Sequence, residues 1–202
     1  MTLQDSIVFV IRFIIFAAFH SLFSAQQLKN LICGIFPKGS QYYRVTYNLV
    51  SLGMFGWVMA SYRNSPVLYY APGVWSLVMY LLQLIIAVAL LACLRQTGIA
   101  DFTGIRQIRS NETAEPCLVA TGFYAVVRHP LYLLSTLFLV LNPVMTAQWL
   151  LLTVLSTIYF ICGALIEERR LFKQFGDEYR RYQQNTPFII PSLVKFRQPP
   201  SV

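Results

Sequence analysis

The residues best suited to chemistry in this chain stand just before an apolar run, in the order Arg128, His129, Pro130 and Tyr132. Proline suits the first turn of a helix, because the N–H group that it lacks would be unpaired there anyway. The N–H groups that follow Pro130 then form a positive helix end, which attracts a carboxylate or a phosphate. Arg128 adds a fixed positive charge, so this segment predicts a site for an anionic group.

Acidic side chains are scarce, and two of the eight stand side by side as Glu167 and Glu168, at the end of the last long apolar run. Carboxylates in this position can bind an ammonium group or another cation. Both polar segments adjoin the same end of the last two apolar runs, so we expect them to lie close together and to suit a zwitterionic ligand. The residues alone also allow a plainer interpretation, in which one segment anchors a helix at the membrane interface and the other forms local ion pairs.

Apolar runs must hold these two segments in place. The chain has 202 residues, of which 56% are hydrophobic and 12% charged, whereas soluble domains carry about 25% charged residues. This composition excludes a conventional soluble enzyme and a disordered protein. Because a spanning helix needs roughly 20 mostly apolar residues, we predict an all-α integral membrane protein with about five transmembrane helices. The predicted spans are residues 7–23, 45–60, 74–94, 131–145 and 146–166.

The last two spans and the segment after them have features of their own. Asn142-Pro143 separates the two spans, which predicts a C-terminal helical hairpin. Beyond it, apolar side chains at helical spacing predict a cytoplasmic amphipathic helix at the membrane surface. That stripe contains Leu171, Phe172, Phe175, Tyr179 and Tyr182. We therefore divide the chain into a three-span membrane region, residues 1–94, and a region with the binding segments, residues 95–202.

The net charge of +8 reflects topology. With five spans, fourteen of the sixteen basic residues fall on one side of the membrane. By the positive-inside rule the N-terminus lies outside, and the C-terminus and both polar segments are cytoplasmic. Since this distribution suits anionic lipid headgroups, we expect membrane lipids and no nucleic acid as partners. None of the four cysteines forms a CxxC pair, so we expect neither disulfides nor a metal site.

The motifs around both polar segments resemble a superfamily of membrane enzymes. Gly122-Phe-Tyr124, residues 128–132 and Glu167-Glu168 are similar to the hallmark of the isoprenylcysteine carboxyl methyltransferases and their relatives, among them phospholipid methyltransferases. Towards the N-terminus, Phe19-His20-Ser21 and Asp101-Phe-Thr-Gly104 look closest to the methanethiol S-methyltransferase branch, whose members are also called NnrU-like. The resemblance implies an enzyme that transfers a methyl group from S-adenosyl-L-methionine to a small or lipophilic thiol.

The resemblance also implies where the cofactor binds. By the family pattern, Glu167 would hold the ammonium group of the cofactor, and the helix start with His129 would hold its carboxylate. The candidate catalytic residues are Arg128, which would lower the pKa of a thiol or orient an anionic acceptor, and Glu168. The implied cofactor-binding residues are Gln107, Pro116, Cys117, Leu118, Val119, Tyr124, His129, Pro130, Leu131, Tyr132 and Glu167.

One departure from the family pattern bears on the substrate. The prenylcysteine enzymes carry an arginine for the substrate one turn before the glutamate pair, and this chain has Gly163 there. This difference argues against the carboxyl methylation of an isoprenylcysteine-like substrate, which stays an alternative together with phospholipid N-methylation. Two further alternatives are reductase chemistry and a non-enzymatic membrane transport or assembly protein. The sequence leaves the oligomeric state open.

Overall fold

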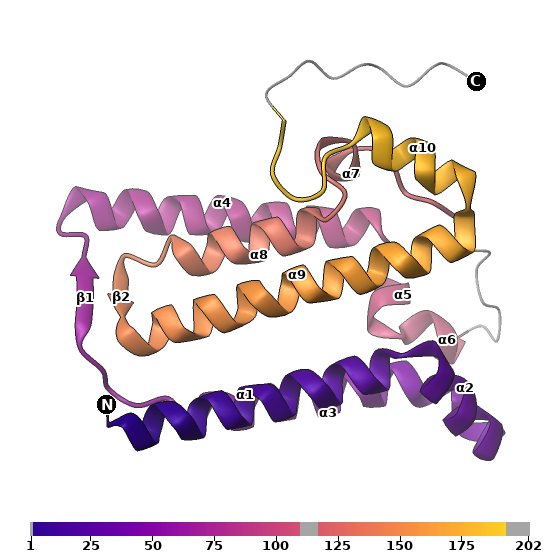
Figure 1. The fold of residues 1–202 in the computed structure, drawn as a ribbon, viewed down its shortest axis with the longest axis horizontal. Coiled ribbons are helices and arrows are strands. Elements are labelled where there is room, and N and C mark those ends of the chain that lie inside the picture. The colour runs from indigo at the N-terminus through magenta and orange to yellow at the C-terminus, as the bar shows by residue number, and fades with distance from the viewer. Residues whose placement is uncertain (1, 110–116, 193–202) are drawn as a thin grey trace. The chain divides into compact units, whose positions relative to one another are not determined.

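The computed structural model describes residues 2–109 and 117–192, and most of them lie in helices (Figure 1). The elements in chain order are α1 (Leu3–Ser24), α2 (Gln26–Ile35), the 3-10 helix η1 (Pro37–Tyr42), α3 (Tyr43–Met59), β1 (Val67–Tyr70), α4 (Val74–Gln96), α5 (Ile99–Thr103), α6 (Ile105–Arg109), α7 (Phe123–Val126), α8 (Pro130–Val140), β2 (Val144–Thr146), α9 (Ala147–Phe175) and α10 (Asp177–Asn185).

Three of the described helices, α1, α4 and α9, are long and apolar enough to cross a membrane. They contain 22, 23 and 29 residues, so each reaches at least about 33 Å at a rise of about 1.5 Å per residue. Their surfaces carry large aliphatic side chains, such as Leu77 at 67% and Leu84 at 61% exposure, which water would solvate poorly. The chain is therefore a membrane protein. Helices α3 and α8 contain 17 and 11 residues, so the predicted five spans and the hairpin stay predictions.

The described residues fold into two compact units whose segments alternate along the chain. Among the described residues, the first unit consists of residues 2–70, 98–109 and 144–155, and the second of residues 71–97, 117–143 and 156–192. Helix α9 begins in the first unit and ends in the second. The predicted division into a membrane region, residues 1–94, and a binding region, residues 95–202, is a functional one and stays a prediction.

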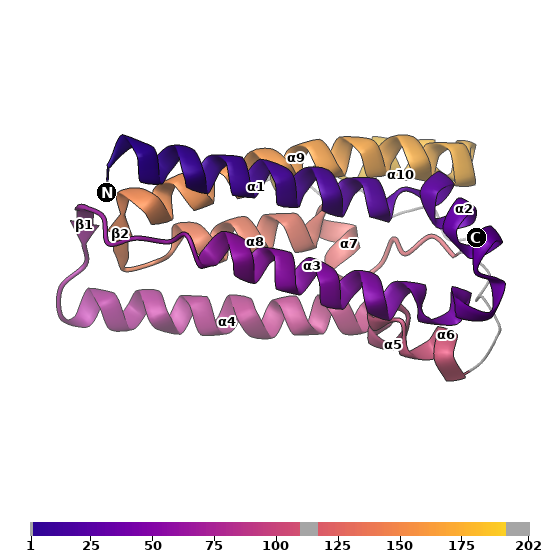
Figure 2. The same cartoon turned by 90° about the horizontal axis from the view of Figure 1, so that it is seen from below.

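Helices α1 and α3 run side by side in the first unit (Figure 2). Phe9 and Phe13 of α1 and Val58 of α3 are buried. At the start of α1, Thr2 and Asp5 form a capping box that satisfies N–H groups at the helix start. The junction of α5 and α6 lies against α3 at Gly104, where a Cβ atom would come within 2.9 Å of the Arg44 Cβ atom. Only glycine fits this crossing.

The first unit also contains a two-stranded antiparallel sheet, in which β1 pairs with β2. The all-α prediction missed this sheet. The two strands have four and three residues, too few to show a periodic pattern, and pairing depends on segments that are far apart in the sequence. Next to β2, the fully buried Gln148 accepts a hydrogen bond from the backbone N–H of Arg63 at 2.7 Å, and its amide donates to the Ser61 carbonyl at 3.3 Å.

In the second unit, α8 lies along α4 (Figure 1). The Gln83 amide of α4 donates a hydrogen bond to the Phe138 carbonyl of α8 at 2.9 Å. Helix α9 ends before Gly176, whose φ of +55° is a conformation that favours glycine. Because this break changes the helix direction, the predicted amphipathic stripe does not continue as one face: Phe172 is 40% exposed, whereas Tyr179 on α10 is fully buried.

Candidate functional site

The turn before α7, at residues 121–123, lies against Gln96 at the end of α4. Gly122 has a φ of +58°, and a Cβ atom there would lie only 2.6 Å from the Gln96 Nε2 atom. The Gln96 amide donates to the Thr121 carbonyl, and its Oε1 atom accepts from the Phe123 N–H at 3.3 Å. Gln96 therefore fixes the start of α7 and with it the position of Tyr124.

The chain after α10 pairs through its backbone with the segment that precedes α8. The N–H of Arg128 donates to the Pro187 carbonyl at 2.9 Å, and the N–H of His129 donates to the Phe188 carbonyl at 3.2 Å. His129 is the residue before the first turn of α8, and Pro130 is the first helical residue, as predicted from the sequence. The C-terminal segment thus lies directly against the start of α8.

The Arg128 guanidinium is surrounded by acceptors. Its Nε donates to the Glu168 Oε1 atom at 2.6 Å, and its Nη1 donates to the carbonyls of Gln183 at 3.0 Å and Thr186 at 2.6 Å. It also lies over the Phe188 ring, 5.6 Å from the centroid. Only 11% of its side chain is exposed. Arg128 therefore ties α9, α10 and the C-terminal segment to the start of α8.

Glu168 is the centre of the same network. Its carboxylate accepts hydrogen bonds from Gln183 at 2.9 Å and from the Tyr179 hydroxyl at 3.3 Å, besides the contact with Arg128. Its side chain is 14% exposed. We call the four side chains Arg128, Glu168, Tyr179 and Gln183 the C-terminal clamp. A carboxylate with this many donors is stabilised in its charged form and is occupied by the protein itself.

His129 lies between the two glutamates and is almost completely buried. Its Nε2 is 3.3 Å from Glu168 Oε1, and its Nδ1 is 3.7 Å from Glu167 Oε2. The ring stacks on Tyr132 with centroids 5.6 Å apart and meets the Phe188 ring edge-on. Burial lowers the pKa of His129 below its ordinary value, and this effect outweighs the opposing influence of the two carboxylates. The imidazole is therefore mostly neutral at pH 7.

Glu167 differs sharply from its neighbour, because 46% of its side chain is exposed. The Tyr132 hydroxyl donates to its Oε2 atom at 3.1 Å. The Tyr132 ring also stacks on Phe160 with centroids 5.6 Å apart. One turn before Glu167, a Cβ atom on Gly163 would lie 3.7 Å from the Tyr132 hydroxyl. An accessible carboxylate thus lies beside stacked aromatic rings, a combination that attracts cations.

Two further tyrosines close the site towards α7. The Tyr182 hydroxyl donates to the Tyr124 carbonyl at 2.6 Å, which holds α10 against α7. Burial is the main cause that raises the pKa of Tyr182 to about 12, and burial also raises the pKa of Tyr124 above its ordinary value. Both hydroxyls therefore stay protonated at neutral pH and can act as hydrogen-bond donors.

The structure brings most of the predicted site residues into the second unit. The two polar segments lie together, as expected, because Arg128 and Glu168 are in direct contact. Leu118 and Val119 are half-buried in the stretch before α7, and Cys117 is exposed. Leu131 follows Pro130 in the first turn of α8.

Two predicted cofactor residues are not among the described residues of the second unit. Pro116 is outside the described residues. Gln107 belongs to α6 in the first unit, and its Oε1 atom is buried without a hydrogen-bond partner among the described residues. Within residues 2–109 and 117–192, no group of three or more His, Cys, Asp or Glu side chains is arranged to hold a metal ion.

Sequence reasoning missed several residues that shape the site. Gln96 and Gln183 gave no signal, because a single glutamine at a helix end is common and its partners are distant in the sequence. Phe160 stands inside an apolar run, where its contact with Tyr132 cannot be distinguished from ordinary packing. Phe188 lies in the segment after α10, which the sequence did not connect with His129.

Comparisons with known proteins agree on one group of relatives. The chain is similar to methanethiol S-methyltransferase 1 of Bradyrhizobium diazoefficiens, with 38% identity over 95 residues, which are 45% of this chain and 33% of that protein. It is similar to the methanethiol S-methyltransferases of Pseudomonas deceptionensis, with 40% identity over 70 residues (35% of this chain, 27% of that protein), and of Mycobacterium tuberculosis, with 32% over 95 residues (45% and 39%).

These matches cover less than two fifths of the length of each of these relatives. No solved structure is significantly similar to the chain. The family described as NnrU protein matches residues 8–187, a range that includes both polar segments and nearly all the described helices. The chain therefore belongs to the NnrU protein family.

Proposed function

We propose that this chain is an integral membrane methyltransferase that uses S-adenosylmethionine and methylates a small or lipophilic thiol. Its similarity to proteins named methanethiol S-methyltransferase supports the reaction and the acceptor class. The structural observation that carries the proposal is the unequal state of the two adjacent acids. Glu168 is enclosed by donors of the protein, whereas Glu167 is exposed and turned towards aromatic rings.

The exposed acid suits one end of the cofactor. S-adenosylmethionine supplies, when bound, a methyl group on a positively charged sulfur. Glu167 would hold its ammonium group through charge-assisted hydrogen bonds, which are about twice as strong as neutral ones. The Tyr132 hydroxyl donates to this carboxylate, and the stacked rings of Tyr132 and Phe160 lie beside it. The residues around Glu167 therefore fit a cationic ligand.

The carboxylate of the cofactor needs a positive partner. The start of α8 offers the N–H groups that follow Pro130, where a helix dipole favours an anion. The His129 ring is a poorer partner for a carboxylate than we expected, because it is buried, mostly neutral and in contact with two glutamates. We infer that His129 instead sets the spacing of Glu167 and Glu168. The contacts predicted for Tyr124, Leu118, Val119 and Leu131 belong to the same proposal, as do those of Pro116 and Cys117.

Arg128 and Glu168 act as positioning residues in this proposal. The Arg128 guanidinium already donates to three acceptors of the protein, so it has little capacity to activate a thiol. The C-terminal clamp instead holds α10 and the segment after it against the start of α8. This arrangement fixes the wall of the site, and orientation is the main contribution that an enzyme can make to an in-line methyl transfer.

The acceptor is best described as small or lipophilic. Gly163 leaves space beside the Tyr132 hydroxyl, where the prenylcysteine enzymes would have an arginine. Without that cation, an acceptor with a carboxylate has no obvious partner, which disfavours carboxyl methylation. When a thiolate attacks a sulfonium, two opposite charges disappear, and a site shielded from water favours such a reaction. Apolar helices on either side of the site would supply that shielding.

We also propose that the chain crosses the membrane five times, with the N-terminus outside and the C-terminus and cofactor site in the cytoplasm. Helices α1, α4 and α9 would be full spans, and α3 and α8 would be shorter ones. The basic residues after α4 and around α10 support this orientation by the positive-inside rule. Labelling of single cysteines from each side of the membrane tests it, since Cys117 should react only from the cytoplasmic side.

Calorimetry and a methyl-transfer assay test the function. The purified protein in detergent should bind S-adenosylhomocysteine and should transfer a labelled methyl group to methanethiol or a larger thiol. The Glu167→Gln variant should bind about 10- to 100-fold more weakly, because a hydrogen bond to a charged group contributes about 1.5–3 kcal/mol. Glu178→Gln on α10 is the matched control, because Glu178 is also exposed, and it should bind like the wild type.

Three results would contradict the proposal. If the wild-type protein does not bind S-adenosylhomocysteine at any workable concentration, the methyltransferase assignment is wrong. If Glu167→Gln binds as tightly as Glu178→Gln, the ammonium site lies elsewhere. Transfer to phosphatidylethanolamine or to a prenylcysteine analogue, but to no thiol, would replace the proposed acceptor by one of the two alternatives.

A further inference from the structure

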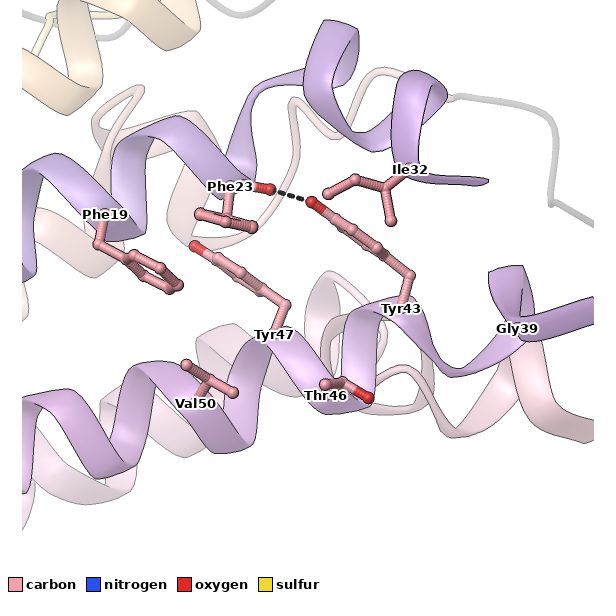
Figure 3. A pocket seen from close by; sticks show the side chains of 8 residues that line it. All are labelled: Phe19, Phe23, Ile32, Gly39, Tyr43, Thr46, Tyr47 and Val50. Carbon is pink, nitrogen blue, oxygen red and sulfur yellow. Dashed lines mark hydrogen bonds between the residues drawn. The ribbon is translucent and has the colours of Figure 1, made fainter. Parts of the chain in front are cut away.

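We propose that the first unit binds one acyl chain of an anionic phospholipid in a cavity at the end of α1. The cavity has a volume of about 270 Å³ and lies between the end of α1, helix α2, η1 and the start of α3 (Figure 3). Four aromatic and two aliphatic side chains form most of its wall: Phe19, Phe23, Tyr43, Tyr47, Ile32 and Val50. All the residues that line it belong to the first unit.

The polar ends of the two tyrosines are already engaged. The Tyr43 hydroxyl donates to the Phe23 carbonyl at 2.6 Å. The Tyr47 hydroxyl lies 2.8 Å from the His20 Nε2 atom and 3.2 Å from the His20 carbonyl oxygen. Figure 3 shows both side chains extending from α3 towards α1, so that their rings form the wall of the cavity. Both tyrosine hydroxyls are engaged, and apart from Thr46 and Gly39 the wall consists of rings and aliphatic groups, which suits a hydrocarbon.

The wall of the cavity is held in a fixed form. The rings of Phe19 and Phe23 stack with centroids 4.1 Å apart. His20 bridges the two helices, because its Nδ1 is 2.9 Å from the Ser51 hydroxyl while its Nε2 contacts Tyr47. These contacts keep α1 and α3 at a set separation beside the cavity. The cavity is therefore built into the packing of the first unit.

The size of the cavity matches part of an acyl chain. Its volume is close to the lower end of small-molecule pockets, which is about 300 Å³. If a methylene group fills about the space of a water molecule, ~30 Å³, the cavity accommodates roughly nine methylenes. Val50 on its wall is 41% exposed, so the cavity opens to the surroundings of α3. An acyl chain from the bilayer can enter without crossing the protein.

The charges near the cavity favour an anionic headgroup. The chain has no acidic residue from residue 6 to residue 100. Lys29 lies one turn before Ile32 on α2, on the same side of that helix, and Arg44 follows Tyr43 at the start of α3. Basic residues at a membrane surface attract anionic lipids. A phospholipid with its chain in the cavity would place its phosphate within the field of these cations.

Photolabelling of the whole protein in nanodiscs tests the proposal. The probe is a phosphatidylglycerol with a diazirine near the end of one acyl chain, diluted into phosphatidylcholine. Mass spectrometry should find the label on the segments that line the cavity, residues 19–23 and 43–50. A phenyl ring at residue 50 takes the room of about two methylenes, so Val50→Phe should reduce this labelling roughly ten-fold. Leu52→Phe is the matched control on the same helix, because Leu52 is 68% exposed and does not line the cavity.

A second measurement, competition between lipids, does not depend on the Val50→Phe variant. Unlabelled phosphatidylglycerol should compete with the probe in the cavity segments, phosphatidylcholine should not, and Lys29→Gln should weaken this preference. Label spread evenly over the exposed faces of α1 and α4, insensitive to competition, would overturn the proposal, because only annular lipid would then be present. Equal competition by both lipids would overturn the anionic headgroup. Neither measurement uses methyl transfer, so failure here would leave the proposed enzyme intact.

Discussion

Glutamine at residue 168 keeps the shape of Glu168 and removes its charge, so Glu168→Gln tests the C-terminal clamp directly. In the wild type, the carboxylate pairs with Arg128 at 2.6 Å and accepts from Gln183 and Tyr179. The variant side chain can still accept a hydrogen bond from Arg128 through its amide oxygen. It leaves the guanidinium without a negative partner, although the carbonyls of Gln183 and Thr186 remain.

The expected loss of stability follows from these contacts. Removal of one partner of a fully buried ion pair costs about 3–5 kcal/mol. The side chains of Arg128 and Glu168 are 11% and 14% exposed, and Arg128 keeps its carbonyl acceptors. We therefore expect Glu168→Gln to lower the free energy of unfolding by about 2 kcal/mol, the strength of one hydrogen bond to a charged group. Arg128→Gln should cost more, about 3 kcal/mol, because three acceptors lose their charged donor.

Two measurements in detergent examine this prediction. Denaturant unfolding gives the change in free energy, and hydrogen exchange shows where protection is lost. Protection in Glu168→Gln should fall first in residues 177–188, because this segment depends on the clamp. The losses of unfolding free energy in Arg128→Gln and Glu168→Gln should be less than additive in the double variant, since both substitutions break the same contact between Arg128 and Glu168.

The neighbouring acid provides the contrast. Glu167→Gln should leave the unfolding free energy within about 0.5 kcal/mol of the wild type, because surface substitutions rarely do more, and should weaken ligand binding. If Glu168→Gln instead unfolds like the wild type, keeps protection in residues 177–188 and loses S-adenosylhomocysteine binding, then Glu168 contacts the ligand. The positioning role would then be wrong.

Two further predictions concern the surroundings of the clamp. Gly122→Ala and Gly176→Ala place a Cβ atom on nearly the same backbone conformation, φ +58° and +55°. Each substitution should lower the free energy of unfolding by about 1 kcal/mol through backbone strain. Gly122→Ala should cost about 1 kcal/mol more, because it displaces the Gln96 hydrogen bonds. Equal losses for the two variants in denaturant unfolding would refute a role for Gln96. Because burial lowers the pKa of His129, its contribution to stability is complete above about pH 6.5, the ordinary pKa of histidine, and decreases as the pH falls below that value. Unfolding from about pH 7.5 to 5 should show this decrease in the wild type and a smaller one in His129→Gln, and identical profiles would contradict it.

The sequence was sufficient for the parts of the fold that depend on composition or local motifs. Apolar runs located α1, α4 and α9, and the proline rule placed the start of α8 at Pro130. It was insufficient where two distant segments decide the outcome. The pairing of β1 with β2, and the backbone contacts of Arg128 and His129 with residues 187–188, leave no local pattern. The burial of Tyr179 could not be predicted either, because it depends on the change of direction at Gly176, where φ is positive.

The pair of acids shows why a motif identifies a site without assigning roles within it. Consecutive residues on an α-helix point about 100° apart, so Glu167 and Glu168 have different surroundings, although the His129 ring contacts both. In the sequence the two carboxylates are chemically equivalent, and their residue types do not show which one would bind the ammonium group of the proposed cofactor. The difference arises in part from α10, because Tyr179 and Gln183 donate hydrogen bonds to Glu168. Any family member that keeps both glutamates but lacks these partners on α10 should therefore lose the distinction between a structural acid and a binding acid.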